Sequence, residues 1–248
     1  MSLIIFTFAL FANIWIWKIY SFSIITGLSV TLASFLVYLY FYKDKPVFKI
    51  TFILSVLFLF FVFVNTTQVK PITEISDHEL HIRQVRMSQY PPLTIKLKEK
   101  NIRIPVASLF ENRKESVVFF RMLENMFFVS DPNLYFFANH PRETSGIKEF
   151  EKYPYILLPF FLYGTTRLIR NKKKNLFFGL LTAGIITAGL VGSQNPMGPV
   201  LFFPFLTFVI FLGLSELLNK TPMRKSAVFV FLILYMAVMI QTISYELY

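Results

Sequence analysis

Apolar residues dominate the chain on both sides of one long polar stretch, residues 66–153. A helix needs about 20 apolar residues to cross a hydrocarbon core about 30 Å thick. The pattern therefore predicts an all-α polytopic membrane protein with about seven transmembrane helices, three within residues 1–65 and four within residues 154–248. The candidate spans, of which the first and fourth are short, are residues 3–17, 22–42, 47–64, 154–166, 176–192, 199–217 and 227–244.

The polar stretch predicts a small mixed α+β domain outside the membrane. Apolar and polar residues alternate over residues 93–107, around Glu99-Lys100-Asn101, which favours a β-hairpin because Asn tolerates the positive φ of tight turns. Over residues 114–129 apolar residues recur at helical spacing, and the turn-forming residues 130–133 end that helix. Its Phe- and Met-rich face suits a domain core and a membrane interface equally well.

Composition supports membrane embedding, with 55% apolar residues, 31 Phe and only 16% charged residues. The net charge of +11 gathers in alternate connections between the candidate spans. Eleven basic residues lie there: Lys43, Lys45, Lys49, Arg167, Arg170, Lys172, Lys173, Lys174, Lys220, Arg224 and Lys225. The intervening short connections hold Lys18 alone.

Because cytoplasmic connections carry the excess of Lys and Arg, this asymmetry predicts a cell-membrane protein with a cytoplasmic N terminus. The C terminus and residues 66–153 are then extracytoplasmic. The positive charge is explained by topology and by anionic lipid, so we expect no nucleic-acid partner.

The candidate spans carry no ionisable residue away from their ends, which disfavours an ion pump or a proton-coupled transporter. Gly184, Ala188 and Gly192 recur at four-residue spacing, and we expect this face to form a close helix contact. We also expect four prolines near the outer ends of two spans to break or kink the helices beside a wet cavity. These are Pro154, Pro159, Pro199 and Pro204.

The sequence offers little conventional catalytic chemistry. It has no Cys, and its three His all lie in the polar stretch. The segment from Asp77 to His81 falls one residue short of the H-E-x-x-H spacing that places two imidazoles on one helical face. We therefore predict neither a metal site nor a cofactor, although a metal-dependent hydrolase stays a third alternative.

Residues 130–143 form the strongest candidate site. Aromatic side chains there alternate with amides, an imidazole and a guanidinium, a mixture able to bind a sugar or a phosphate. The candidate ligand-binding residues are Asp131, Asn133, Tyr135, His140 and Arg142. The alternative is a turn-rich connection held together by its own hydrogen bonds.

Three runs carry a family resemblance: "FFVSDPNLYFFANHPRE", "EFEKYPYILLPFFLYGTTRLIRNKKK" and "QNPMGPVLFFPFLTFVIFLGLSEL". Across residues 117–217 the chain resembles the later part of bacterial GT-C class membrane glycosyltransferases, which use lipid-carrier sugars. The resemblance implies an outer-leaflet cavity for a polyprenyl-phosphate donor or a lipid-like acceptor. It further implies that His140 and Arg142 lie on the phosphate side and Asn195 at the mouth.

The chain departs from that family in its first outer connection, residues 18–21, which has no carboxylate where those enzymes carry their catalytic acid. A positioned base is needed to activate an acceptor hydroxyl. We therefore expect a non-catalytic or accessory relative that binds a polyprenyl-phosphate-type membrane lipid. The alternative is a scaffold or assembly subunit of a cell-envelope complex, with a partner membrane subunit or a second copy of the chain.

Overall fold

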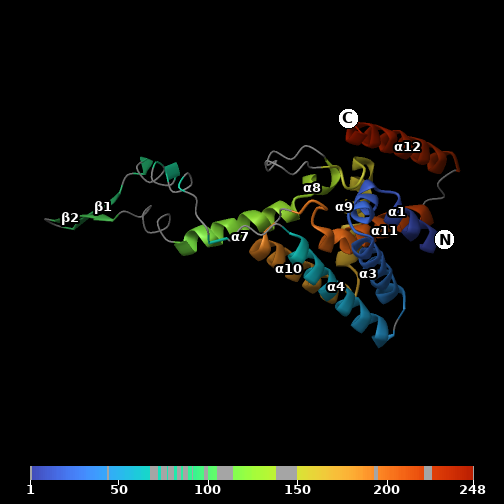
Figure 1. Cartoon of the computed structure of the whole chain (residues 1–248), viewed down its shortest axis with the longest axis horizontal. Coiled ribbons are helices and arrows are strands. Elements are labelled where there is room, and N and C mark those ends of the chain that lie inside the picture. Colours follow the sequence, from blue (N-terminus) through green and yellow to red (C-terminus); the bar gives the residue numbers. More distant parts are fainter. Residues whose placement is uncertain are drawn as a thin grey trace.

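The computed structural model describes residues 2–43, 45–67, 72–73, 77, 81–82, 85, 89–90, 92–97, 100–104, 114–137, 150–192, 195–220 and 225–247. These residues are mostly helical. Figure 1 shows a helical bundle from which α7 (Lys114–Ser130) projects, with a two-stranded hairpin, β1 (Leu93–Leu97) and β2 (Lys100–Ile104), beyond its far end. The molecule is therefore elongated, with its apolar mass at one end.

Among the described residues, three helices are long and apolar enough to cross a membrane, or four if a bent pair counts as one span. The three are α3 (Ile24–Tyr42), α4 (Pro46–Thr66) and α10 (Lys174–Val191). The bent pair is α1 (Ser2–Phe11) and α2 (Ile14–Phe22), and shorter apolar stretches lie in α9 (Leu158–Ile169), α11 (Phe203–Lys220) and α12 (Lys225–Leu247). The protein is thus helical and built for apolar surroundings, while seven spans stay a prediction.

Residues 3–17, expected as one span, are divided between α1 and α2, whose axes differ by 60°. Asn13 explains the break. Its buried side chain accepts a hydrogen bond from Ile16 N (2.9 Å) and donates to Ala9 O (3.2 Å) and Leu10 O (2.9 Å). One amide therefore caps the start of α2 and the end of α1, since it carries both an acceptor and two donors.

The four prolines begin helices and do not kink them. Pro154 and Pro199 precede the short 3-10 helices η1 (Tyr155–Leu157) and η2 (Val200–Phe202). Pro159 and Pro204 lie in the first turns of α9 and α11. Proline costs no backbone hydrogen bond at these positions, because the first amides of a helix have no intrahelical acceptor.

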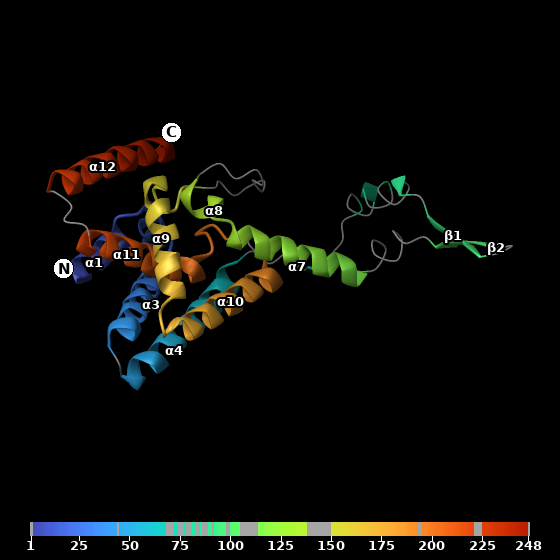
Figure 2. The same cartoon turned by 180° about the vertical axis from the view of Figure 1, so that it is seen from behind.

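The closest helix contact joins α9 and α11, which run past each other in Figure 2. A Cβ at Gly164 would overlap the carbonyl of Val209, and a Cβ at Gly213 would overlap the carbonyl of Phe160. Glycine at both positions lets the two backbones touch, as small residues do between membrane helices. Arg167 forms an ion pair with Glu216 near the C-terminal end of α9.

Of the three residues expected to pack on one face of α10, two are buried in contacts and the third ends the helix. Gly184 and Ala188 are buried, and a Cβ at Gly184 would come 2.5 Å from Leu201 Cδ1. Gly192 instead follows the helix end with φ of +111°, and a Cβ there would meet nothing within 4 Å. Gly192 therefore ends α10 through its backbone conformation, which side chains disfavour, and does not pack against another helix.

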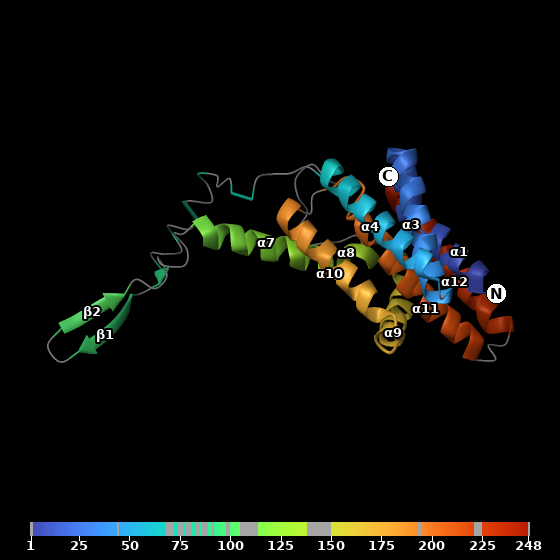
Figure 3. The same ribbon diagram turned by 90° about the horizontal axis from the view of Figure 1, so that it is seen from below.

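Two elements of the polar stretch match the sequence pattern. The hairpin pairs Leu93 with Ile104 and Leu97 with Lys100, so Lys100 and Asn101 belong to its second strand. The helix predicted over residues 114–129 is α7, which ends at Ser130. Figure 3 shows α7 between the hairpin and the bundle, and the predicted α+β domain as a unit stays a prediction.

We predict that Gly164→Ala and Gly213→Ala each lower the free energy of unfolding by about 1–3 kcal/mol or more, because the added methyl group meets backbone atoms that cannot rotate away. Gly179→Ala is the matched control. It lies within α10 with nothing within 4 Å of its Cβ, so helix propensity gives no change or a gain of up to about 1 kcal/mol. Thermal melting in detergent measures all three, and equal losses would refute the glycine contact.

Candidate functional site

Trp15, at the start of α2, is buried and joins several connections of the bundle. Its indole Nε1 donates a hydrogen bond to Met197 O at 2.6 Å, and its backbone N donates to Lys152 O at 3.3 Å. Its ring contacts three further aromatic rings, with centroid distances between 5.1 and 5.7 Å. We call this group the Trp15 junction: Trp15, Tyr135, Lys152, Tyr153, Met197 and Phe203.

Lys152 is 0% exposed, an unusual environment for an ammonium group. Its Nζ donates a hydrogen bond to Leu134 O at 3.0 Å and lies 4.8 Å from the centroid of the Phe150 ring. Gly198 makes room for it, since a Cβ there would come 2.7 Å from Lys152 Cε. A buried cation needs such acceptors because it has lost its hydration.

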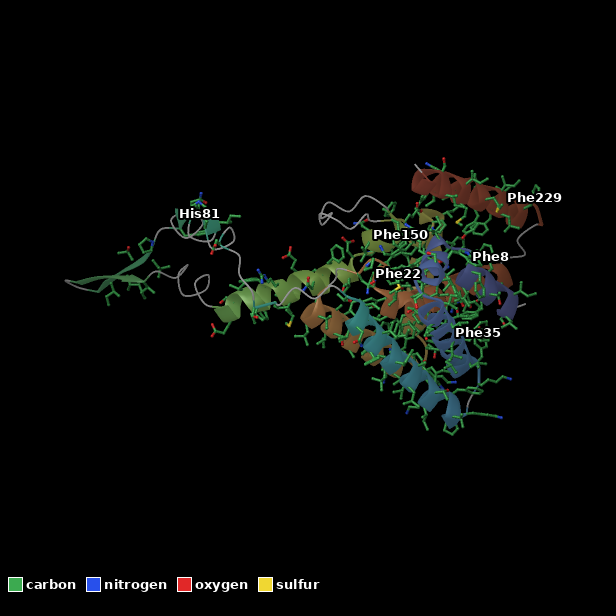
Figure 4. All side chains as sticks on the ribbon, in the orientation of Figure 1. Phe8, Phe22, Phe35, His81, Phe150 and Phe229 are labelled. Atoms are coloured by element: carbon green, nitrogen blue, oxygen red, sulfur yellow. The ribbon has the colours of Figure 1, made fainter. Side chains whose placement is uncertain are left out.

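A second cation reaches the same ring. Lys18, on α2, is half-buried, and its Nζ lies 3.8 Å from the centroid of Phe150. Figure 4 shows Phe150 within the bundle and His81 far from it, on the polar stretch. The two ammonium groups therefore share one aromatic ring, and each gains cation–π attraction from it.

Tyr153 ties the junction to α11. Its hydroxyl lies 2.7 Å from Thr207 Oγ1, and its backbone N donates to Tyr135 O at 2.8 Å. Burial raises the pKa of the Tyr153 phenol, which therefore stays neutral and acts as a hydrogen-bonding anchor.

Glu151, two residues before Tyr153, connects this part of the chain to α12 through hydrogen bonds. One carboxylate oxygen accepts a hydrogen bond from Tyr155 N at 2.9 Å, and the other accepts from Thr242 Oγ1 at 3.0 Å. The neighbouring residues Glu151 and Lys152 therefore hold different parts of the bundle, the first at α12 and the second at the Trp15 junction.

The predicted site residues that the structure describes are held by internal hydrogen bonds. Asp131 Oδ1 accepts from Asn133 N at 2.9 Å, which forms the turn after α7. The Tyr135 hydroxyl, in the short helix α8 (Asn133–Phe136), donates to Val129 O at 2.6 Å. His140 and Arg142 lie outside the described residues.

Asn195, expected at the mouth of a cavity, is buried and fixes the connection between α10 and η2. Its Nδ2 donates to Thr66 Oγ1 (2.9 Å) and Thr67 Oγ1 (3.3 Å) at the end of α4, while its Oδ1 accepts from Met197 N (2.9 Å). Tyr135 therefore lies within the Trp15 junction, and Asn195 is joined to it through the hydrogen bond with Met197 N.

Comparisons with protein-family models, curated proteins and solved structures found no match. Lys152 was not predicted from the sequence, because a lysine beside Glu151 in a polar stretch is usually a solvated surface charge. Lys18 gave a clearer signal, as the lone basic residue in the short connections expected outside the cytoplasm.

We predict that Trp15→Phe lowers the free energy of unfolding by about 1–3 kcal/mol, because Met197 O stays buried without its donor. Trp17→Phe is the control, since it is 58% exposed and also donates its Nε1, to Phe11 O at 2.9 Å. Phe11 is only partly buried, unlike Met197, so its carbonyl can bond to solvent and we expect a loss below about 1 kcal/mol. Equal melting shifts would contradict a special role for the junction.

Proposed function

We propose that this protein is embedded in a membrane and holds an anionic lipid of the polyprenyl-phosphate type at the outer leaflet. The observation that carries the proposal is the approach of two ammonium groups, those of Lys18 and Lys152, to the ring of Phe150. In sequence, Phe150 directly follows residues 138–149, which contribute His140 and Arg142 as further candidate phosphate ligands.

A lipid phosphate matches this site in charge and in its expected depth in the membrane. A lysine near the end of a membrane helix can extend its ammonium group to the headgroup region, where phosphate groups lie. Ammonium and guanidinium groups form short charge-assisted hydrogen bonds with phosphate oxygens, which are stronger than neutral ones. Lys18 is the natural first contact because it is half-buried, whereas Lys152 lies fully inside and adds positive potential.

The proposed topology has seven spans, with the Trp15 junction outside. Two groups of contacts at opposite ends of the helices support it. At one end Asn195 meets the end of α4, and at the other Lys173 Nζ donates to Tyr40 O (3.1 Å) and Phe41 O (3.3 Å) at the end of α3. The second end carries most of the clustered basic residues, as expected of a cytoplasmic face.

We further propose an accessory, non-catalytic role beside a lipid-linked-sugar glycosyltransferase, in line with the sequence resemblance. A catalytic carboxylate must be positioned to take a proton from an acceptor hydroxyl. The nearby described carboxylates already stabilise the fold, Glu151 between η1 and α12 and Asp131 in the turn after α7. The partner is then a catalytic membrane subunit or a second copy of this chain.

The main competing function is a scaffold of a cell-envelope complex. Its support is that the Trp15 junction is held by hydrogen bonds within the protein, as a purely structural joint would be. The two functions differ in bound lipid: the scaffold needs none, whereas the lipid-holding protein keeps polyprenyl phosphate through gentle extraction.

We predict that Lys18→Ala reduces retained polyprenyl phosphate about tenfold or more, because a charge-assisted hydrogen bond contributes about 1.5–3 kcal/mol. Lys18→Arg should keep most of the lipid, since the positive charge stays. Mass spectrometry of protein extracted from membranes and supplied with undecaprenyl phosphate measures the retention.

Lys172→Ala is the matched control, because Lys172 is exposed near the opposite ends of the helices and should change nothing. Arg142→Ala should also lower retention, and Arg142→Lys should restore it only in part because lysine lacks the planar fork. A folded Lys18→Ala protein that keeps its lipid would refute the site, and a wild-type protein that retains none would favour the scaffold.

A further inference from the structure

One side of α7 packs against the end of α10. A Cβ at Gly189 would come 2.6 Å from Met126 Cγ and 3.2 Å from Met122 Cγ, so glycine lets the two helices approach closely. Asn125 Nδ2 adds a hydrogen bond to Gly189 O at 3.2 Å. The position of α7 relative to α10 is therefore fixed by packing and by a polar contact.

The other side of α7 is apolar and uncovered. Phe119, Phe120 and Phe127 are 52%, 56% and 69% exposed. At 100° per residue these three fall on one face of the helix, and the exposed acidic residues Glu115 and Glu124 flank it. A water-facing helix rarely exposes three phenylalanines together, so this face requires a partner.

The contact with α10 sets the depth of that face. At 1.5 Å per residue, the 18 residues of α10 span about 27 Å, close to the thickness of a hydrocarbon core. Gly189 lies two residues before the helix ends at Val191, so α7 crosses α10 at about the hydrocarbon boundary. Ile186 and Leu190, near the same end of α10, are also exposed.

We propose that α7 is an interfacial helix whose Phe119, Phe120 and Phe127 face lies in the boundary between lipid headgroups and acyl chains. Aromatic residues favour that boundary, and acidic residues at the margins of the face stay in water. The proposal depends on membrane embedding and is independent of the phosphate site at Lys18. Its consequence is that the part of the extracytoplasmic segment formed by α7 is held on the bilayer and not free in solution.

Because the chain has no cysteine, single nitroxide labels test this directly. We choose Phe120→Cys and Phe127→Cys as test positions, with Glu115→Cys and Glu124→Cys as controls on the margins of the same helix. The full-length protein is placed in nanodiscs of phosphatidylcholine and phosphatidylglycerol in equal parts. Collision rates with oxygen, which concentrates in lipid, are compared with those of a water-soluble nickel chelate.

We expect the ratio of oxygen to nickel collisions to be several-fold higher at positions 120 and 127 than at 115 and 124. Equal ratios at all four positions would mean that the face lies in water, which overturns the proposal. Labels at 120 and 127 that neither reagent reaches would mean that a protein, such as a second copy, covers the face, which also overturns it. The substituted side chains are exposed, and melting curves verify that the variants stay folded.

Discussion

A break in a buried helix leaves backbone groups that water cannot reach, so the protein itself must supply their partners. This constraint governs the arrangement around Trp15. The side-chain amide of Asn13 forms hydrogen bonds with both helix ends at the break between α1 and α2. The indole of Trp15 donates a hydrogen bond to the carbonyl of Met197. Lys152 and Asn195 do the same for the chain after α7 and the chain after α10. Three irregular connections are thus packed together around Trp15.

The Trp15 junction also positions the charged groups of the proposed lipid site. The buried ammonium group of Lys152 lies near the ring of Phe150, and the ammonium group of Lys18, on α2, lies near the same ring. Because Gly198 leaves space for the lysine stem, the cation is held without displacing Trp15. The charges are therefore placed by the interactions that close the helix break, and a ligand would not have to order them. Such preorganisation lowers the cost of binding.

The sequence predicted the elements that depend on local periodicity, including α3, α4, α10 and α7, because apolar spacing alone specifies them. It did not predict the break at Asn13, since a single amide in an apolar run gives no periodic signal. It also placed close helix packing at Gly184, Ala188 and Gly192, whereas the backbones touch at Gly164 and Gly213. Which glycine faces another helix is decided by the crossing geometry, which spacing does not encode. Ligand binding by Tyr135 and Asn195 stays a prediction from their segments, whereas the hydrogen bonds from Asn195 to Thr66 and Thr67 depend on contacts far apart in the sequence.

Sidedness tests the account most directly, because a lipid site at the outer leaflet requires Lys18 and the basic connection after α9 to lie on opposite faces of the membrane. Ser21→Cys and Lys172→Cys, each the only cysteine in its protein, are exposed to a membrane-impermeant maleimide in intact cells and in inverted vesicles. The account predicts that Ser21→Cys labels in intact cells and that Lys172→Cys labels only in inverted vesicles. Labelling of both positions from the same side would contradict it.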